Sequence, residues 1–308
     1  MINEKLKKIL FEQGYRFAGN HTVVKTCRWT RKSLSKGEVC YKEKWYPPVK
    51  SHRCLQMSPS LFCNHNCLFC WRMHSGDRNL NWKESFEGLK IDEPKEVLEK
   101  CIKERELLLQ GFKGFEKVDK SKWKEALKPN TMAISLTGEP TMYPYLDDLI
   151  SEAHKMGIVT FLVTNGTFPE KLASLTHKPF QLYVTLPAPN RKIYENLCRP
   201  LIPSLWEKLN ETLELMNSFD FRKVIRLTLV KGFNMVNPEE YGKLIDKANP
   251  NFVEAKGYVH VGESQKRLPK EGMPHHEDIL RFAKSLEENS GYKIKDDFRP
   301  SRVVLLTK

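Results

Sequence analysis

Short apolar runs alternate with longer amphipathic stretches along most of the chain. The short runs have the length of strands. They cover residues 54–58, 132–137, 159–164, 181–186, 224–230, 252–261 and 303–307. Between them, apolar residues recur with helical spacing over 93–109, 146–156, 205–217, 238–248 and 276–288. This strand–helix–strand order predicts parallel βα units.

Six or seven such units predict an α/β barrel or partial barrel, in which the loops after the carboxyl ends of the strands carry the chemistry. The first fifty residues differ, because they are polar, rich in aromatic residues and cysteine, and show little periodicity. We therefore expect an N-terminal extension over 1–53 and a main domain over 54–308 that forms one structural unit. The basic segment 113–130 contains Trp123, interrupts the rhythm, and is expected to be an insertion on the loop side.

The composition suits one large domain. The chain has 308 residues, of which 40% are hydrophobic, and this is enough for a full core. No apolar run approaches the length of a membrane span. The N-terminal residues MINEKLKKIL lack the apolar core of a secretory signal. We expect a cytoplasmic, monomeric protein with no membrane partner.

The chain is strongly basic, with a formal net charge of +13 and a pI of about 9.2. A polyanionic partner explains this charge, because lysine and arginine gain affinity by releasing counterions from phosphates. A lysine-rich solvated surface explains it equally well. The basic residues form three clusters: Lys25, Arg28, Arg31, Lys32 and Lys36; Lys42, Lys44, Lys50, His52 and Arg53; and Lys113, Lys117, Lys120, Lys122 and Lys124.

The chain has 8 cysteines, and six of them fall between Cys27 and Cys70. In a reducing compartment such cysteines favour metal binding or catalysis over disulfides. Cys101 lies in a helical pattern and Cys198 in a Leu-Cys-Arg-Pro turn, so we interpret these two as packing residues.

The run Cys63-Asn64-His65-Asn66-Cys67-Leu68-Phe69-Cys70 directly follows the first predicted strand. Three closely spaced thiolates can hold three irons of a [4Fe–4S] cube and leave the fourth iron open to a small molecule. The alternative is a structural zinc site, which needs four ligands. His65 is the one further candidate nearby, but it lies inside the same short loop, where a single ion is hard to enclose.

This three-cysteine spacing, with an aromatic residue before the last cysteine, resembles the signature of the radical S-adenosylmethionine (SAM) superfamily. The resemblance implies a partial TIM-type (β/α)6 barrel, a [4Fe–4S] cluster on Cys63, Cys67 and Cys70, and bound SAM. It also implies a set of residues that contact SAM after successive strands: Thr137, Gly138 and Glu139 for the amino group, Asn165 and Thr185 for the ribose or carboxylate, and Val259 and Gly262 for the adenine. An acid that many relatives carry shortly after the position of Thr185 is missing here.

A second cysteine set, Cys27, Cys40 and Cys54, precedes this loop with wide spacing. Three more thiolates cannot serve the first cluster without closing its open iron. They can hold a second [4Fe–4S] cluster with one free iron. The alternatives are a zinc site or three unrelated buried cysteines.

Taken together, the chain resembles the tRNA-4-demethylwyosine synthase family, in its single-domain archaeal form. The resemblance covers nearly the whole sequence. The segments that carry it are the second cysteine set, SPSLFCNHNCLFCWR (58–72), SLTGEPTMYP (135–144), FLVTNGT (161–167), CRPLI (198–202) and AKGYVHVGESQKRLP (255–269).

The family resemblance implies a carbon–carbon lyase of wyosine biosynthesis. The substrates would be N1-methylguanosine at position 37 of tRNA-Phe, in the anticodon stem-loop, and pyruvate. The product would be the tricyclic base 4-demethylwyosine. A radical derived from SAM would take hydrogen from the N-methyl group, and the resulting radical would attack C2 of pyruvate. The bond from C2 to the carboxyl carbon would break, that carbon would be lost, and the exocyclic amine would close the ring. A separate flavodoxin- or ferredoxin-type protein would donate the electron.

Several alternatives remain open from the sequence. Pyruvate could bind the free iron of the second cluster, or form a Schiff base with Lys42, two residues after Cys40; Lys42 could also be a surface lysine. Trp29 or Trp123 could stack on a displaced base or lie in the core. The rival functions are another radical SAM enzyme that modifies RNA or a peptide with an auxiliary cluster, and a non-enzymatic zinc-containing RNA-binding protein.

Overall fold

The computed structural model of the chain describes residues 2–80 and 88–308. The chain forms two compact units. The first comprises Met1–Cys63, Ser75–Leu162 and Thr176–Phe180, and the second comprises Asn64–His74, Val163–Leu175 and Gln181–Lys308. No helix in the described residues is long and apolar enough to cross a membrane.

The sheet of the first unit joins an antiparallel edge to a parallel centre. Strands β1, β2 and β3 pair antiparallel, and β3, β4 and β5 pair parallel. Gln56, Ala133 and Phe161 lie side by side in register, so they share one face of the sheet. Leu55 and Met57 point to the opposite face, where both are fully buried. The strands are β1 (Arg16–Phe17), β2 (Val23–Val24), β3 (Cys54–Ser58), β4 (Thr131–Ile134) and β5 (Val159–Thr164), the last two residues of β5 belonging to the second unit.

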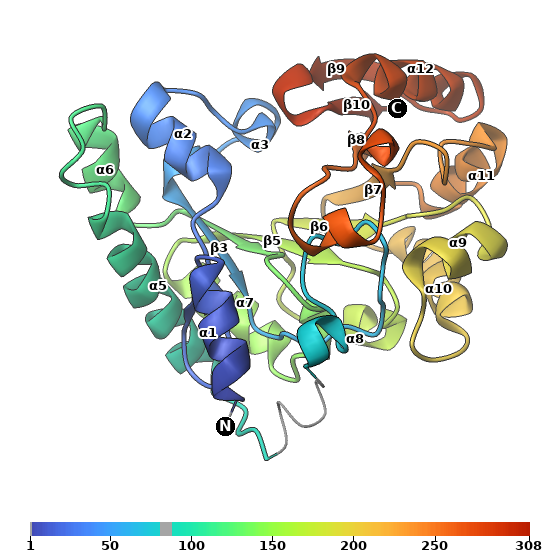
Figure 1. Ribbon diagram of the computed structural model, residues 1–308. Coiled ribbons are helices and arrows are strands. Elements are labelled where there is room, and N and C mark those ends of the chain that lie inside the picture. Colours follow the sequence, from blue (N-terminus) through green and yellow to red (C-terminus); the bar gives the residue numbers. More distant parts are fainter. Residues whose placement is uncertain (1, 81–87) are drawn as a thin grey trace. The chain divides into compact units, whose positions relative to one another are not determined.

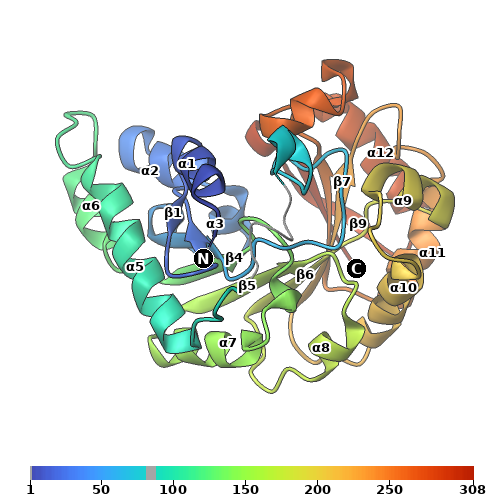
Figure 2. The ribbon, with the colours of Figure 1, turned by 60° about the horizontal axis from the view of Figure 1, so that its bottom comes forward.

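Helices cover both faces of this sheet. Figures 1 and 2 show α5 and α7 along one side of the strands and α2 and α3 on the other. Helix α5 follows β3 and α7 follows β4, as the helices of parallel βα units do. The helices of the first unit are α1 (Glu4–Glu12), α2 (Arg28–Lys36), α3 (Tyr41–Trp45), α5 (Pro94–Gln110), α6 (Lys120–Ala126) and α7 (Leu146–Lys155).

The second unit repeats the parallel pattern and ends in an antiparallel pair. Strands β6, β7 and β8 are parallel, β10 pairs antiparallel with β8, and β9 forms the outer strand. The strands are β6 (Gln181–Thr185), β7 (Lys223–Leu229), β8 (Phe252–Gly257), β9 (Lys293–Phe298) and β10 (Val303–Thr307). The helices are α8 (Pro169–Ala173), α9 (Arg191–Cys198), α10 (Leu205–Met216), α11 (Pro238–Ala248) and α12 (His276–Glu288).

Short 3-10 helices complete the two units. They are η1 (Ser51–Arg53), η2 (Asp77–Asn79), η3 (Pro140–Met142), η4 (Gly262–Lys266), η5 (Lys270–Gly272) and η6 (Arg299–Ser301).

The predicted βα rhythm is confirmed, because each of the two described units contributes three parallel strands that are followed by helices. Two predicted strands are too long. The strand predicted over 132–137 ends at Ile134, and the one over 252–261 ends at Gly257. The last predicted strand, 303–307, is present but runs antiparallel. The predicted division into 1–53 and 54–308 stays a prediction. Each of the two compact units is made of three separate segments of the chain, and none of their boundaries falls at residue 53.

The first fifty residues hold more structure than their pattern suggests. Helix α1 buries only Leu6 and Leu10, and α2 buries Thr30, Ser33 and Leu34. Such short helices with two or three buried residues leave little periodic signal in the sequence.

The segment 113–130 does not lie on the loop side, so that prediction is wrong. Helix α5 runs back along the strands, which brings the following segment to their amino ends. There the backbone N–H of Asn130 donates to the carbonyl oxygen of Arg53 at 3.2 Å, just before β4 and β3 begin.

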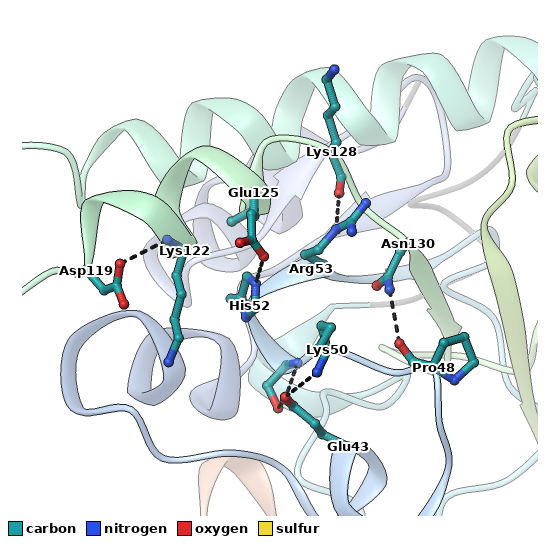
Figure 3. Close-up of polar contacts among 12 residues, drawn as sticks. Glu43, Pro48, Lys50, His52, Arg53, Asp119, Lys122, Glu125, Lys128 and Asn130 are labelled. Atoms are coloured by element: carbon teal, nitrogen blue, oxygen red, sulfur yellow. Dashed lines mark hydrogen bonds and ion pairs between the residues drawn. The ribbon is translucent and has the colours of Figure 1, made fainter.

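Polar contacts fix this segment to the extension (Figure 3). His52 pairs with Glu125 at 2.9 Å, Arg53 donates to the carbonyl oxygen of Lys128 at 2.8 Å, and Asn130 donates to that of Pro48 at 3.1 Å. Trp123 lies in the core, 8% exposed, and its indole N–H donates to the carbonyl oxygen of Leu109. Trp123 is therefore a packing residue, whereas Trp29 is half-buried.

Candidate functional site

The three-cysteine loop follows the carboxyl end of β3. Cys63 belongs to the first unit, whereas Cys67 and Cys70 belong to the second. All three are reduced thiols and are partly exposed. A hydrogen bond with Cys198, together with burial, raises the pKa of Cys67, and burial raises that of Cys70. Such thiols ionise readily only when a cation takes up the charge, as a metal centre does.

A buried polar network holds the Asn64–His65 part of this loop in the second unit. Tyr194 lies 2.5 Å from Nε2 of His65, and the amide nitrogen of Asn165 donates to Oδ1 of Asn64 at 2.7 Å and lies 2.9 Å from Nδ1 of His65. Nδ1 of His65 also lies 3.0 Å from Oδ1 of Asn64. Burial lowers the pKa of His65 to about 4, which keeps the ring neutral. Asn165, predicted to contact SAM, thus orients the cysteine loop.

The carboxyl end of α9 binds the same loop through the backbone. The N–H of Leu68 donates to Leu197 at 2.9 Å, and that of Asn66 donates to Cys198 at 3.1 Å. Cys198 is 1% exposed, in agreement with its interpretation as a packing residue, and it also contacts Cys67. Helix α9 was missed in the sequence, although Asn190 as N-cap and apolar residues at Ile193, Tyr194 and Leu197 mark it.

Residues after β8 hold the other side of the loop. Arg267 donates to the carbonyl oxygens of Cys70 at 2.6 Å and Arg72 at 3.1 Å. Gly262 has a φ of +60° and lies so close to the carbonyl group of Trp71 that a Cβ would collide with it. Gly262 and Val259, both predicted to contact adenine, are exposed beyond the end of β8. Thr185 is half-buried at the carboxyl end of β6.

In the first unit, Thr137, Gly138 and Glu139 pack against the start of the cysteine loop. The hydroxyl of Ser58 donates to the carbonyl oxygen of Thr137. The N–H of Glu139 donates to the carbonyl oxygen of Phe62 at 2.5 Å, directly before Cys63. The carboxylate of Glu139, 2% exposed, accepts from the hydroxyl of Thr141 at 2.7 Å. These residues fix the loop at the carboxyl ends of β3 and β4.

The second cysteine set gathers at the opposite end of β3. Cys27 precedes α2, Cys40 precedes α3, and Cys54 begins β3. Burial and the nearby Cys27 raise the pKa of Cys40 to about 12 and that of Cys54 to about 11. The three thiols are therefore within electrostatic range of one another. Cys54 and Ser58, at the two ends of β3, are about 13 Å apart at the usual rise of a strand.

Two cations lie beside these thiols. Lys42, on α3, acts on both Cys40 and Cys54 by lowering their pKa, and its ammonium lies 4.6 Å from the centre of the Phe161 ring. Lys42 is half-buried. Arg105 is buried beneath β3 and donates to the carbonyl oxygen of Cys54 at 3.2 Å. Lys42 is thus placed over the same sheet face as Gln56 and Phe161, next to the thiols.

The donor set of this second site is made of thiols and a neighbouring cation. Cys27, Cys40 and Cys54 act on one another's pKa, and the ammonium of Lys42 lies beside them. Thiolates are the donors that a [4Fe–4S] cube takes, one on each iron. Among residues 2–80 and 88–308, neither this set nor the cysteine loop groups three His, Cys, Asp or Glu side chains as a single ion requires.

Comparisons with known proteins agree with this arrangement. The family model "Radical SAM superfamily" matches residues 57–245, and "Wyosine base formation" matches residues 247–308. The S-adenosyl-L-methionine-dependent tRNA 4-demethylwyosine synthase of Pyrococcus abyssi is 47% identical over 99% of this chain and 89% of its own length. That of Methanocaldococcus jannaschii is 42% identical over 99% of this chain and 96% of its own length.

A solved structure of TYW1 with a lysine–pyruvate adduct bound is also similar. It has a TM-score of 0.89 and 40% sequence identity, over 100% of this chain and 96% of that chain. The predicted fold class, a radical SAM partial barrel with an N-terminal extension, is confirmed by this match and by the parallel βα units.

The βα units, the three-cysteine loop after β3 and the matching family model define a radical SAM enzyme, which uses a [4Fe–4S] cluster and SAM. The similar proteins identify the family within this class of enzymes. The chain belongs to the S-adenosyl-L-methionine-dependent tRNA 4-demethylwyosine synthases, the radical SAM enzymes of wyosine biosynthesis, and it acts on tRNA.

The close approach at Gly138 generates a test. Gly138 and Gly37 both have positive φ, 62° and 70°, so an alanine at either position meets the left-handed backbone cost of about 1–2 kcal/mol. Only at Gly138 would the new Cβ also collide with the carbonyl oxygens of Ser60 and Phe62. Gly138→Ala should therefore lower the free energy of unfolding more than Gly37→Ala, and should also weaken SAM binding. Chemical denaturation and equilibrium binding of SAM measure both; equal losses for the two variants would contradict the packing role.

Proposed function

We propose that this chain converts N1-methylguanosine at position 37 of tRNA-Phe, together with pyruvate, into 4-demethylwyosine, as a carbon–carbon lyase. The observation that carries the proposal is the group of Cys27, Cys40 and Cys54 with the ammonium of Lys42 beside it. The similar structure with a lysine–pyruvate adduct bound supports the choice of pyruvate and of a lysine.

In this proposal the chain binds two [4Fe–4S] clusters. Cys63, Cys67 and Cys70 hold the first, which supplies, when bound, the electron that cleaves SAM. Cys27, Cys40 and Cys54 hold the second. Two sites are favoured over one because Cys54 begins β3, whereas Phe62, next to Cys63, is bound at the carboxyl end of β4. Thr137, Gly138, Glu139, Asn165, Thr185, Val259 and Gly262 are the proposed SAM contacts.

Lys42 is the proposed pyruvate residue. Its deprotonated amine attacks the keto carbon of pyruvate, a C=N bond forms, and water leaves. The imine draws electrons from C2 and so prepares this carbon for attack by the substrate radical. Phe161 faces the amine and shields it from water. Binding through the second cluster alone is the alternative.

The tRNA surface of this proposal is formed by α2 and α6. Leu34 of α2 packs with Trp123 and Ala126 of α6, and the backbone N–H of Asp119 donates to the carbonyl oxygen of Leu34 at 2.9 Å. The packing joins the first and third basic clusters into one surface. Its exposed cations are Arg28, Arg31, Lys36, Lys113, Lys117, Lys120 and Lys124. We propose that they bind tRNA phosphates, with Trp29 as the candidate for stacking on a base.

The cysteine sets are tested by alanine variants. Cys63→Ala, Cys67→Ala or Cys70→Ala should abolish SAM cleavage, because a cube that lacks a ligand loses its site for SAM. Cys27→Ala, Cys40→Ala or Cys54→Ala should leave about four irons of about eight per chain and keep SAM cleavage, but form no tricyclic base. Iron content and anaerobic assay of 5′-deoxyadenosine measure these outcomes.

The control for the cysteine variants is Cys101→Ala, a fully buried cysteine of α5 outside both sets. It should keep both clusters. About four irons in the unmutated, fully reconstituted chain would contradict the second cluster, and zinc in place of iron would favour the RNA-binding alternative. Base formation without pyruvate would favour another radical SAM reaction.

Borohydride trapping tests Lys42. Incubation with labelled pyruvate and borohydride should fix the label on the peptide that contains Lys42, because reduction converts the imine into a stable amine. Lys42→Arg should lose the label and the tricyclic product while it keeps both clusters. Lys44→Arg, two residues along the same helix and exposed, is the matched control and should keep both. Full labelling of the Lys42→Arg variant would exclude this lysine.

The tRNA surface is tested by charge removal. The combined change of Arg31, Lys36, Lys117 and Lys124 to glutamine should weaken tRNA binding and reduce its salt dependence by about 0.7–0.9 log units per log salt for each lost phosphate contact. SAM cleavage without tRNA should not change. Glutamines at Lys243, Lys284, Lys293 and Lys295, exposed lysines of the second unit, are the control. Equal affinity and salt slope in both variants would redirect the search to Arg222–Arg226 or Lys266–Lys270.

A further inference from the structure

An exposed apolar pair lies beside the cysteine loop in the second unit. Leu201 and Ile202, between α9 and α10, are 52% and 51% exposed. Two adjacent large aliphatic side chains at that exposure place apolar surface in water, and exposed apolar surface of this kind marks interaction sites.

Backbone hydrogen bonds tie this pair to the loop. The N–H of Leu201 donates to the carbonyl oxygen of Asn64 at 2.9 Å, and the N–H of Asn66 donates to the carbonyl oxygen of Arg199 at 3.1 Å. His65 and Pro200 form a β-bridge between these two bonds. The segment 199–201 thus runs antiparallel to 64–66, and Leu201 and Ile202 follow directly on it.

The rim of the pair is basic. Lys192 and Arg199 stand seven residues apart, which places them on one side of α9 and its carboxyl end, and both are exposed. Arg199 has a positive φ of 48°, so the chain turns sharply there. The neighbouring Arg191 is paired with Glu195 and Glu207. We call Lys192, Arg199, Leu201 and Ile202 the 199–202 surface.

We propose that the 199–202 surface docks a small acidic one-electron carrier protein, which reduces the cluster held by Cys63, Cys67 and Cys70. The inference rests on the proposed function, because it assumes that cluster and a separate donor. One electron leaves the reduced carrier and enters the cluster, and no covalent bond forms or breaks.

The composition of the surface favours a protein over RNA. Redox partners form small, transient interfaces, and the centres of protein interfaces are apolar with arginine enriched. RNA is bound chiefly by cations and aromatic stacking, and the chain has these on α2 and α6. An acidic carrier would pair its charges with Lys192 and Arg199 while its apolar centre covers Leu201 and Ile202. The bonded contact with 64–66 brings the carrier next to the residues that precede Cys67.

The test is anaerobic reduction of the reconstituted protein, followed by stopped-flow absorbance. The probe is a reduced flavodoxin, and dithionite is the small reductant that needs no docking. The double change of Leu201→Glu and Ile202→Glu should slow reduction by flavodoxin about tenfold or more, because it removes the apolar contact and repels an acidic partner. Reduction by dithionite and iron content should not change. Lys192→Glu with Arg199→Glu should slow reduction by flavodoxin most at low salt.

The matched control is Phe233→Glu with Val236→Glu, exposed apolar residues of the same unit, 38% and 42% exposed. It should leave both rates unchanged. Unchanged reduction by flavodoxin in the 199–202 variants would overturn the inference, as would an equal loss with dithionite or an equal loss in the control. Weaker binding of the anticodon stem-loop with normal reduction by flavodoxin would assign the surface to RNA instead. If the unmutated protein held no reducible cluster, the proposed function would fail as well.

Discussion

Both cysteine sets depend on the free-energy cost of burying a negatively charged thiolate in the protein interior. Burial, together with the nearby Cys27, raises the pKa of Cys40 to about 12 and that of Cys54 to about 11, so neither thiol ionises at neutral pH without a nearby cation. The chain surrounds the second set with the ammonium of Lys42 and the guanidinium of Arg105, and it places Cys27 where the first turn of α2 begins. In the proposed second cluster, iron would complete this balance. The same cost applies in the cysteine loop, where burial raises the pKa of Cys70.

The contacts that hold the cysteine loop are made largely to its backbone N–H and carbonyl groups. In the second unit, α9 binds one side of Asn66 and Leu68, and Arg267 binds the carbonyl groups of Cys70 and Arg72. Leu68 and Phe69 pack among Leu197, Val230 and Tyr258. In the first unit, Gly138 lets the turn after β4 approach the backbone of the loop. A rigid loop of this kind holds its ligands at a constant spacing, which functional sites need.

Much of this arrangement was predictable, since the parallel strands and the cysteine spacing are local signals. The helices of the extension were not, because α2 and α3 are short and are stabilised by packing on distant parts of the chain, such as Leu34 on Trp123. The place of segment 113–130 was predictable as well. In a parallel βα unit the helix returns to the amino ends of the strands, and this segment lies between the helix and the next strand. The strand β9 was missed because its apolar residues are few and it lies at an edge, with charged residues such as Lys293 and Asp297.

Cys54 begins β3 and the cysteine loop follows its carboxyl end, so the length of this strand contributes to the distance between the two cysteine sets. Five residues from Cys54 to Ser58 set the spacing between the sets along the chain. One residue inserted into β3 would lengthen it by about 3.3 Å and turn Cys54 to the face that Leu55 and Met57 now occupy, away from Cys27 and Cys40. The proposed pair of clusters therefore depends on the length of this strand as well as on the cysteines.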